Sequence, residues 1–141
     1  MTACDVEYTV AICNYEMAET LKQSLRSITD QLDDRFEVLV VDDGSEDGSI
    51  EILDTLASTN EMFRYVIEDN NNLAEARNSS FHHASGNYIL ESLDVDDQYE
   101  PVIEDFCYLC HQIESAMSRD FYLWGRGINM APRELVLEGP Y

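Results

Sequence analysis

Residues 36–49, Phe-Glu-Val-Leu-Val-Val-Asp-Asp-Gly-Ser-Glu-Asp-Gly-Ser, decide the fold. The first six residues are almost continuously apolar and rich in valine, which is typical of a strand buried on both faces of a parallel sheet. The next eight are acidic, small or glycine, the residue types that form turns and cap helices. The stretch therefore predicts a central buried strand over 36–41 that runs directly into an acidic loop over 42–49.

The chain outside this stretch alternates short apolar runs with helical patterns. Met17, Leu21, Leu25 and Ile28 are spaced four, four and three apart, which is the spacing of one helix face. We expect further strands over 8–13, 63–67, 88–93 and 121–124, and helices over 17–28, 50–56, 73–84 and 101–117. Gly86 is expected to end the third helix, and Pro101 to lie in the first turn of the fourth.

This order of elements predicts an α/β fold. Strands that alternate with helices form a mostly parallel sheet, and right-handed crossovers place helices on both of its faces in a doubly wound arrangement. The length of 141 residues fits a single domain, residues 1–141. In such folds ligands bind beyond the carboxyl ends of the strands.

The composition narrows the classes of partner. The chain has 8 Lys and Arg against 29 Asp and Glu, a net charge of −21. A content of 45% hydrophobic residues is too high for a disordered acidic tail. Such a charge repels phosphate backbones and anionic lipid, so we expect no nucleic-acid partner. An anionic ligand would need a local cation. The excess of acids also resembles halophilic proteins.

The start of the chain shows no targeting segment. Met1–Asp5 has no basic start followed by an apolar run, and no apolar stretch approaches the roughly 20 residues that span a bilayer. We therefore expect a cytoplasmic location. In that compartment the cysteines at 4, 13, 107 and 110 are expected to be free thiols.

Two clusters of aspartates follow two of the predicted strands. Asp42 and Asp43 end the second strand, and Asp94, Asp96 and Asp97 follow the fourth. Both clusters are expected at one edge of the sheet, where unpaired like charges repel. A divalent metal would relieve that repulsion, and all-oxygen ligands suit Mg²⁺ or Mn²⁺. The pattern predicts a nucleotide diphosphate site with a metal between protein acids and phosphates.

Five segments together resemble the nucleotide-sugar-binding part of an inverting family-2 glycosyltransferase with the GT-A fold. They are Asn14-Tyr15, the segment 40–49, Asn-Asn-Asn-Leu-Ala-Glu-Ala-Arg-Asn over 70–78, Gly-Asn-Tyr-Ile over 86–89, and Leu-Asp-Val-Asp-Asp over 93–97. The resemblance covers about residues 7–101. It implies a GT-A, Rossmann-like fold and transfer of a sugar from a nucleotide-diphosphate sugar, with a UDP-sugar expected.

The resemblance also implies roles for single residues. Asp42 and Asp43 match the pair whose carboxylate holds the base, and Asn14 and Tyr15 match the residues that flank it. Arg77 matches an arginine near the nucleotide. In the DXD motif, Asp96 is the leading metal ligand, and Asp94 is a second ligand nearer the ribose and sugar.

The same resemblance leaves the acceptor side of the reaction open. In the family the catalytic base follows the DXD region, so we expect the base beyond Tyr141 and take this chain as the donor-binding half. The acceptor could be a glycan, a lipid or a protein. Regions outside this chain would allow peripheral association with the cytoplasmic face of a membrane, and an oligomer is also compatible with the sequence.

Three features depart from the family pattern. Cys13 stands where the family has proline, Asn72 replaces a glycine and is expected in a left-handed conformation, and the strand over 88–93 is one residue longer than usual. These changes leave the turn after the first strand and the register of the DXD motif open.

Other interpretations of these motifs remain. The acidic loops could be simple helix caps, the chain could be a non-catalytic nucleotide-binding or protein-interaction module of the same fold, or Asp94 could be the nucleophile of a phosphatase. Cys107, Cys110 and His111 match the CxxCH haem pattern, but their spacing suits the apolar face of a helix better. His82 and His83 suit a helix C-terminus better than a zinc site.

Overall fold

A computed structural model describes residues 6–69, 72–91, 101–117, 123–124 and 129–138. The strands are β1 (Tyr8–Asn14), β2 (Phe36–Asp42), β3 (Phe63–Ile67), β4 (Tyr88–Glu91), β5 (Leu123–Trp124) and β6 (Asn129–Pro132). The helices are α1 (Ala18–Thr29), α2 (Ser49–Thr59), α3 (Leu73–His83), α4 (Ile103–Met117) and α5 (Arg133–Glu138).

The strands form one six-stranded sheet in the order β3-β2-β1-β4-β6-β5. The first four strands in the chain are parallel, and β6 pairs antiparallel with both β4 and β5. Tyr8 pairs with Phe36 and Asn14 pairs with Asp42, so the carboxyl ends of β1 and β2 lie side by side. β2 and β3 follow β1 on one side of the sheet, whereas β4 lies on the other side of β1. The topological switch point is therefore between β1 and β4.

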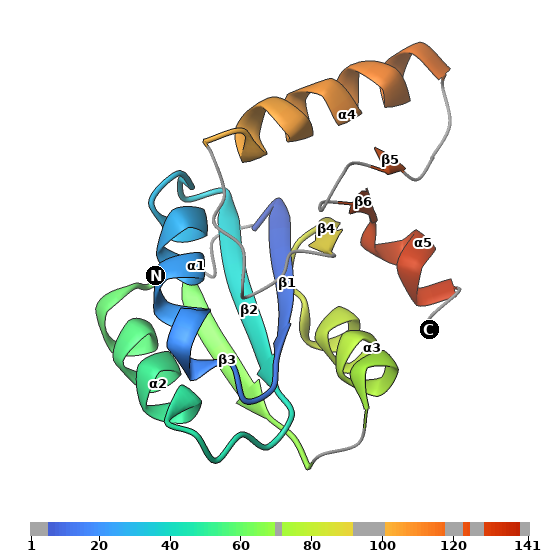
Figure 1. Ribbon diagram of the computed structural model, residues 1–141. Coiled ribbons are helices and arrows are strands. Elements are labelled where there is room, and N and C mark those ends of the chain that lie inside the picture. Colours follow the sequence, from blue (N-terminus) through green and yellow to red (C-terminus); the bar gives the residue numbers. More distant parts are fainter. Residues whose placement is uncertain (1–5, 70–71, 92–100, 118–122, 125–128, 139–141) are drawn as a thin grey trace.

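Helices cover both faces of the sheet, as Figure 1 shows. The larger core lies under α1, α2 and α4 and includes Val10, Val38, Leu25 and Leu53. The smaller core lies under α3 and α5 and is built around Phe81 and Ile89. The doubly wound, mostly parallel fold predicted from the sequence is therefore confirmed.

The element boundaries agree closely with the prediction where apolar runs are long. β3 has the predicted bounds, whereas β1 and β2 each extend by one residue to include Asn14 and Asp42. Neither β6 nor α5 was predicted. The last two residues of the predicted 88–93 strand and the first two of the 121–124 strand lie outside the described residues.

Two local predictions were wrong for reasons that the structure makes clear. Asn72 is extended, with φ −175° and ψ 171°, and its side chain accepts a hydrogen bond from the Glu75 backbone N–H, so it is the N-cap of α3 rather than a left-handed residue. Pro101 lies before α4 rather than in its first turn, because the first helical hydrogen bond runs from Phe106 N–H to the Val102 carbonyl.

Gly86 was wrongly expected to end α3. That helix ends at His83, followed by an extended Ala84. Gly86 has no positive φ and is buried against β1, where a Cβ atom would lie 2.6 Å from the Thr9 nitrogen and 2.8 Å from its Oγ1. Only glycine lets the backbone approach β1 this closely.

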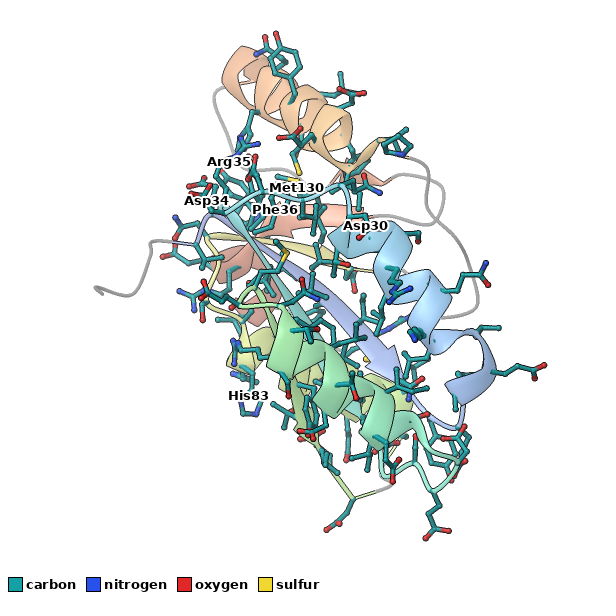
Figure 2. The ribbon with its side chains drawn as sticks, turned by 90° about the vertical axis from the view of Figure 1, so that its left-hand side faces the viewer. Asp30, Asp34, Arg35, Phe36, His83 and Met130 are labelled. Atoms are coloured by element: carbon teal, nitrogen blue, oxygen red, sulfur yellow. The ribbon has the colours of Figure 1, made fainter. Side chains whose placement is uncertain are left out.

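The CxxCH residues belong to the core, as the helix spacing predicted. Cys107 and Cys110 are buried free thiols in the larger core cluster. The His111 Nε2 lies 2.6 Å from the Tyr8 hydroxyl, and burial raises the pKa of Tyr8 to about 12. These contacts fasten α4 to the amino end of the sheet, close to Arg35, Phe36 and Met130 (Figure 2).

A buried carboxylate closes the amino end of β2. Glu37 is 7% exposed and accepts hydrogen bonds from Thr9 Oγ1 at 2.7 Å, from the Ser85 backbone N–H at 2.7 Å, and from Arg64 Nε and Nη2 at 3.2 Å each. Although burial opposes ionisation, these donors together hold the pKa of Glu37 below its usual range. The network ties three strands to the segment after α3.

None of the described helices is long and apolar enough to span a bilayer.

Candidate functional site

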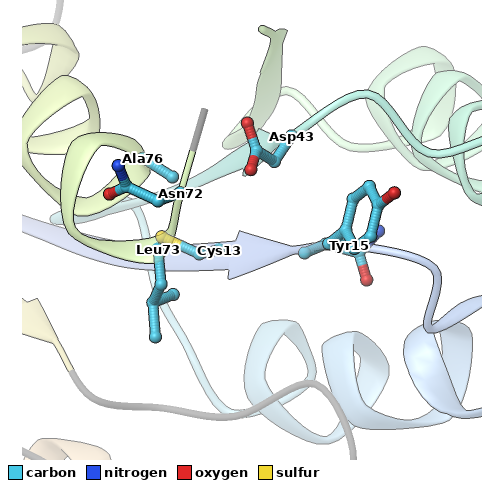
Figure 3. Close-up of a pocket in the computed structure, with 7 residues that line it drawn as sticks. Cys13, Tyr15, Asp43, Asn72, Leu73 and Ala76 are labelled. Atoms are coloured by element: carbon cyan, nitrogen blue, oxygen red, sulfur yellow. The ribbon is translucent and has the colours of Figure 1, made fainter. Parts of the chain in front are cut away.

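A pocket of about 280 Å³ opens at the carboxyl edge of the sheet, beside the switch point. Residues from the end of β1, the loop after β2 and the start of α3 line it, namely Cys13, Asn14, Tyr15, Asp43, Asn72, Leu73 and Ala76. Figure 3 shows six of these labelled side chains gathered around the end of β1. The structure thus brings together three residues that the sequence singled out: Asn14, Tyr15 and Asp43.

Asp42 does not line the pocket, although the sequence placed it beside Asp43. Its side chain is fully buried. One carboxylate oxygen accepts from the backbone N–H groups of Gly44 at 3.0 Å and Ser45 at 2.7 Å, and the other accepts from Asn14 Nδ2 at 2.7 Å. Three donors occupy this carboxylate, so its position is that of a brace for the loop.

Asn14 is oriented by the same carboxylate. An ionised carboxylate only accepts hydrogen bonds, so the amide of Asn14 must present its nitrogen to Asp42. That leaves the Asn14 Oδ1 buried without a hydrogen-bond partner among the described residues. A buried acceptor without a donor costs roughly 1–3 kcal/mol, which marks this end of β1 as incomplete.

Asp43 differs from Asp42 in facing the pocket. Its backbone N–H donates to the Asn14 carbonyl at 3.0 Å, which sets the side chain beside the end of β1. The carboxylate lies between Tyr15 and Asn72 in Figure 3. A residue only 7% exposed that still lines the pocket can offer an acceptor within a largely desolvated site.

Two apolar side chains stand at the mouth of the pocket. Tyr15 is 46% exposed and Leu73 is 57% exposed. An aromatic ring and an aliphatic side chain of this kind can both pack against a planar ring of a ligand. Of the pocket-lining residues, Cys13, Asn72, Leu73 and Ala76 were not proposed as ligand contacts from the sequence.

The acidic loop also holds the two neighbouring helices. One oxygen of Asp47 accepts from the Ala18 N–H at the start of α1, and the other accepts from Ser49 N–H and Oγ at the start of α2. Glu16 takes a left-handed φ of 56° and is held there by its N–H bond to Ser45 Oγ. The helix-cap interpretation is therefore correct for Asp47.

Charges surround the Cys13 thiol at the base of the pocket. Burial raises the pKa of Cys13 to about 12, Arg77 opposes that shift, and Asp43, Glu68 and Glu91 add to it. Arg77, which the sequence placed near the nucleotide, therefore lies within electrostatic range of Cys13, but it is not among the residues that line the pocket. A thiol with so high a pKa stays protonated and is a poor nucleophile.

The predicted metal ligands cannot be placed. Asp94 and Asp96 lie outside the described residues, which resume at Pro101 after Glu91. Among the described residues no group of three His, Cys, Asp or Glu side chains could hold a metal ion.

The sequence matches the profile of the family described as "Glycosyl transferase family 2" over residues 9–116. The chain belongs to this family. The match begins in β1 and runs through most of α4, so it contains the whole pocket.

One curated relative is the cholesterol galactosyltransferase of Borreliella burgdorferi. It is 27% identical over 129 residues, which is 90% of this chain and 36% of the relative. The chain therefore spans about a third of that relative's length. This family membership confirms the resemblance seen in the sequence and shows that the chain is related to enzymes that transfer sugars.

Solved structures agree on the fold. A mannosyltransferase from Pyrobaculum calidifontis in complex with GDP-Man and Mn²⁺ superposes with a TM-score of 0.71 and 22% identity over 96% of this chain and 47% of its own. The TarS protein of S. aureus (residues 1–349) in complex with UDP gives 0.75 and 16% identity over 94% and 48%. At these identities the similarity establishes the GT-A fold alone.

Proposed function

We propose that this chain is the donor-binding part of a glycosyltransferase and takes a UDP-sugar. The observation that carries the proposal is the pocket at the carboxyl edge of β1 and β2, where Asp43 offers a carboxylate beside the partly exposed ring of Tyr15. The solved relatives that hold GDP-Man or UDP support a nucleotide-linked donor of this type.

The pocket residues suggest how the base would bind. The N–H of a uracil ring would donate to the Asp43 carboxylate, while the ring lies against Tyr15 at the mouth. Asp42 would hold the loop that carries Asp43 and would not touch the ligand, because its own three donors already occupy it. This divides between two residues the role that the sequence assigned to the pair.

The phosphates would need a cation, because the chain carries a net charge of −21. We propose that Asp96, with Asp94 nearer the ribose and sugar, holds Mg²⁺ or Mn²⁺ there. The proposal is supported by their position in the sequence just after β4, because β4 lies next to β1 in the sheet and ligands of such folds bind at the carboxyl edge. A bound divalent ion would neutralise charge that builds on the departing diphosphate.

The reaction we propose is inverting transfer to an acceptor hydroxyl, with the catalytic base outside this chain. The acceptor, the cytoplasmic location, the absence of a nucleic-acid partner and the halophilic character stay predictions. The isolated chain could instead bind nucleotide without turnover. Release of UDP from a UDP-sugar in the presence of Mn²⁺ would contradict the binding-module interpretation, because such a module turns over no donor.

Calorimetric titration of UDP into the chain, with MnCl₂ and then with EDTA, tests the donor site. We expect binding with Mn²⁺ that weakens at least tenfold in EDTA. A folded chain that binds no UDP in either buffer contradicts the donor-site proposal. Equal binding in both buffers contradicts only the proposed metal site. Titration of UDP into the variant D96N then serves as a second test of that site.

A further inference from the structure

A second pocket, of about 320 Å³, lies between α1 and α2, away from the donor site. Lys22 and Arg26 line it from α1, whereas Glu51, Ile52 and Leu56 line it from α2. We call this the α1–α2 groove. Its floor is apolar, since Ile52 and Leu56 pack on the larger core, and its rim carries two cations against one acid.

The cations of the groove stand out in so acidic a chain. Of the Lys and Arg side chains in the described part of the molecule, Lys22 and Arg26 are the two for which the structure gives no hydrogen bond or ion pair. Arg35 and Arg64, by contrast, pair with Asp33 and Glu37. With 29 acids against 8 bases, two free neighbouring cations on one helix are a locally complementary surface for an acidic partner.

The outer face of α4 is the matching surface. Tyr108 is 68% exposed, Leu109 52% and Val102 46%, and Asp105 is exposed among them. These positions are three and four residues apart, so they share one side of the helix, and the other side enters the core. Figure 1 shows α4 at the opposite end of the fold from the loop between β2 and α2, with its outer side uncovered in that view.

We propose that the α1–α2 groove of one copy receives the outer face of α4 from a second copy. The apolar side chains of that face would cover Ile52 and Leu56, and Asp105 would lie against Lys22 and Arg26. Both surfaces combine apolar and charged side chains, both are exposed in the part of the chain that the structure describes, and their charges are opposite. The contact joins two different surfaces, so it is heterologous and extends to rings or open chains of copies.

Because the chain is strongly negative overall, the positions of Lys22 and Arg26 determine where a second copy can bind. Two copies of net charge −21 repel each other at long range. Association would then require the acidic helix to meet the rim of the groove where Lys22 and Arg26 lie. Because salt screens the repulsion as well as the attraction, every comparison must be made at one ionic strength.

Sedimentation velocity over a range of concentrations tests the contact. The wild-type chain is expected to form dimers and larger species as its concentration rises. K22Q/R26Q and Y108S/L109S should each raise the dissociation constant at least tenfold. The control Q23E/N87D makes the same change in net charge at exposed positions outside the groove and should assemble like the wild type.

Mixing the two defective variants is the sharper experiment. Each retains the surface that the other lacks, so an equimolar mixture should give a one-to-one heterodimer that stops at two copies. A wild-type chain that stays monomeric at every concentration overturns the proposal. So does a groove variant that assembles like the wild type, or a mixture that gives no heterodimer while circular dichroism shows both variants folded.

Discussion

The two ends of β2 carry buried carboxylates with opposite surroundings. At the amino end, Glu37 meets donors from Thr9, Ser85 and the guanidinium of Arg64. At the carboxyl end, Asp42 meets only neutral N–H donors, and the pocket opens beside it. At the amino end the cation Arg64 pairs with the buried acid, whereas at the carboxyl end the acid Asp43 lines the pocket.

This difference separates two carboxylates held inside the fold from one that lines a pocket. Both oxygens of Glu37 and both oxygens of Asp42 accept hydrogen bonds. Asp43 lines the pocket, and the neighbouring Asn14 Oδ1 has no hydrogen-bond partner among the described residues. Buried polar groups are normally satisfied. We therefore expect Glu37 and Asp42 to stabilise the fold and Asp43 to bind the ligand.

The largest effect is expected at the amino end. E37A leaves three sets of donors without an acceptor, including a guanidinium that is still 41% exposed, so the free energy of unfolding should fall by about 3 kcal/mol. Urea denaturation measures the loss. E61A, at an exposed turn, should stay within about 0.5 kcal/mol of the wild type. Equal losses of unfolding free energy in both variants would contradict a stabilising role for the Glu37 network.

G86A should destabilise the same end by about 2 kcal/mol, because a Cβ atom would meet backbone atoms of Thr9 and Tyr8 at 2.6 and 2.7 Å. Thermal unfolding followed by circular dichroism measures the change. The nucleotide affinity of the folded fraction should not change, since Gly86 is remote from the residues that line the donor pocket. A variant as stable as the wild type would show that β1 and Gly86 are not in close contact.

D42N tests the brace at the carboxyl end. The new amide would keep its oxygen for the Gly44 and Ser45 N–H groups and turn its Nδ2 toward Asn14. The Asn14 amide must then turn over to accept, and it gives up its bonds to residue 42 and to Ser45 Oγ as a donor, so we expect a loss of about 1–2 kcal/mol in the free energy of unfolding. UDP binding should weaken as well, because the loop that carries Asp43 loses its support. The double variant D42N/N14D offers an acceptor again and should recover part of the stability. No recovery would argue against the Asn14–Asp42 bond.

The smallest effect is a dependence on pH. The pKa of Glu37 is below its ordinary value of 4.5 in the folded chain, so its ionised form stabilises the fold above that value. That contribution is lost as the pH falls through the folded pKa. The difference in unfolding free energy between wild type and E37Q should therefore be constant near neutral pH and shrink in acid. A difference that is independent of pH would mean that Glu37 is not ionised in the fold.

The sequence predicted the architecture because its apolar runs allow few alternatives. The runs over 36–41 and 63–67 can hardly be anything but buried strands, and their order requires a parallel sheet. The antiparallel β6 was missed because Asn129–Pro132 is short, lacks a periodic pattern and ends in proline. Its pairing with β4 depends on tertiary contacts that no local pattern reveals.

The site was predicted only in part for a similar reason. Adjacent identical residues such as Asp42 and Asp43 look alike in a sequence. Only the folded contacts show that Asp42 is held by Asn14 and the loop N–H groups while Asp43 lines the pocket. Asn72 was misjudged because asparagine suits both a left-handed turn and an N-cap. Its position immediately before the helical pattern of α3 was the signal that favoured the cap.

The division of roles between Asp42 and Asp43 is tested most directly by titrating UDP into D43N in the presence of Mn²⁺, with urea denaturation of the same sample. The account predicts that D43N binds UDP at least tenfold more weakly than the wild type while losing less stability than D42N. A D43N chain that binds UDP as tightly as the wild type would contradict the account.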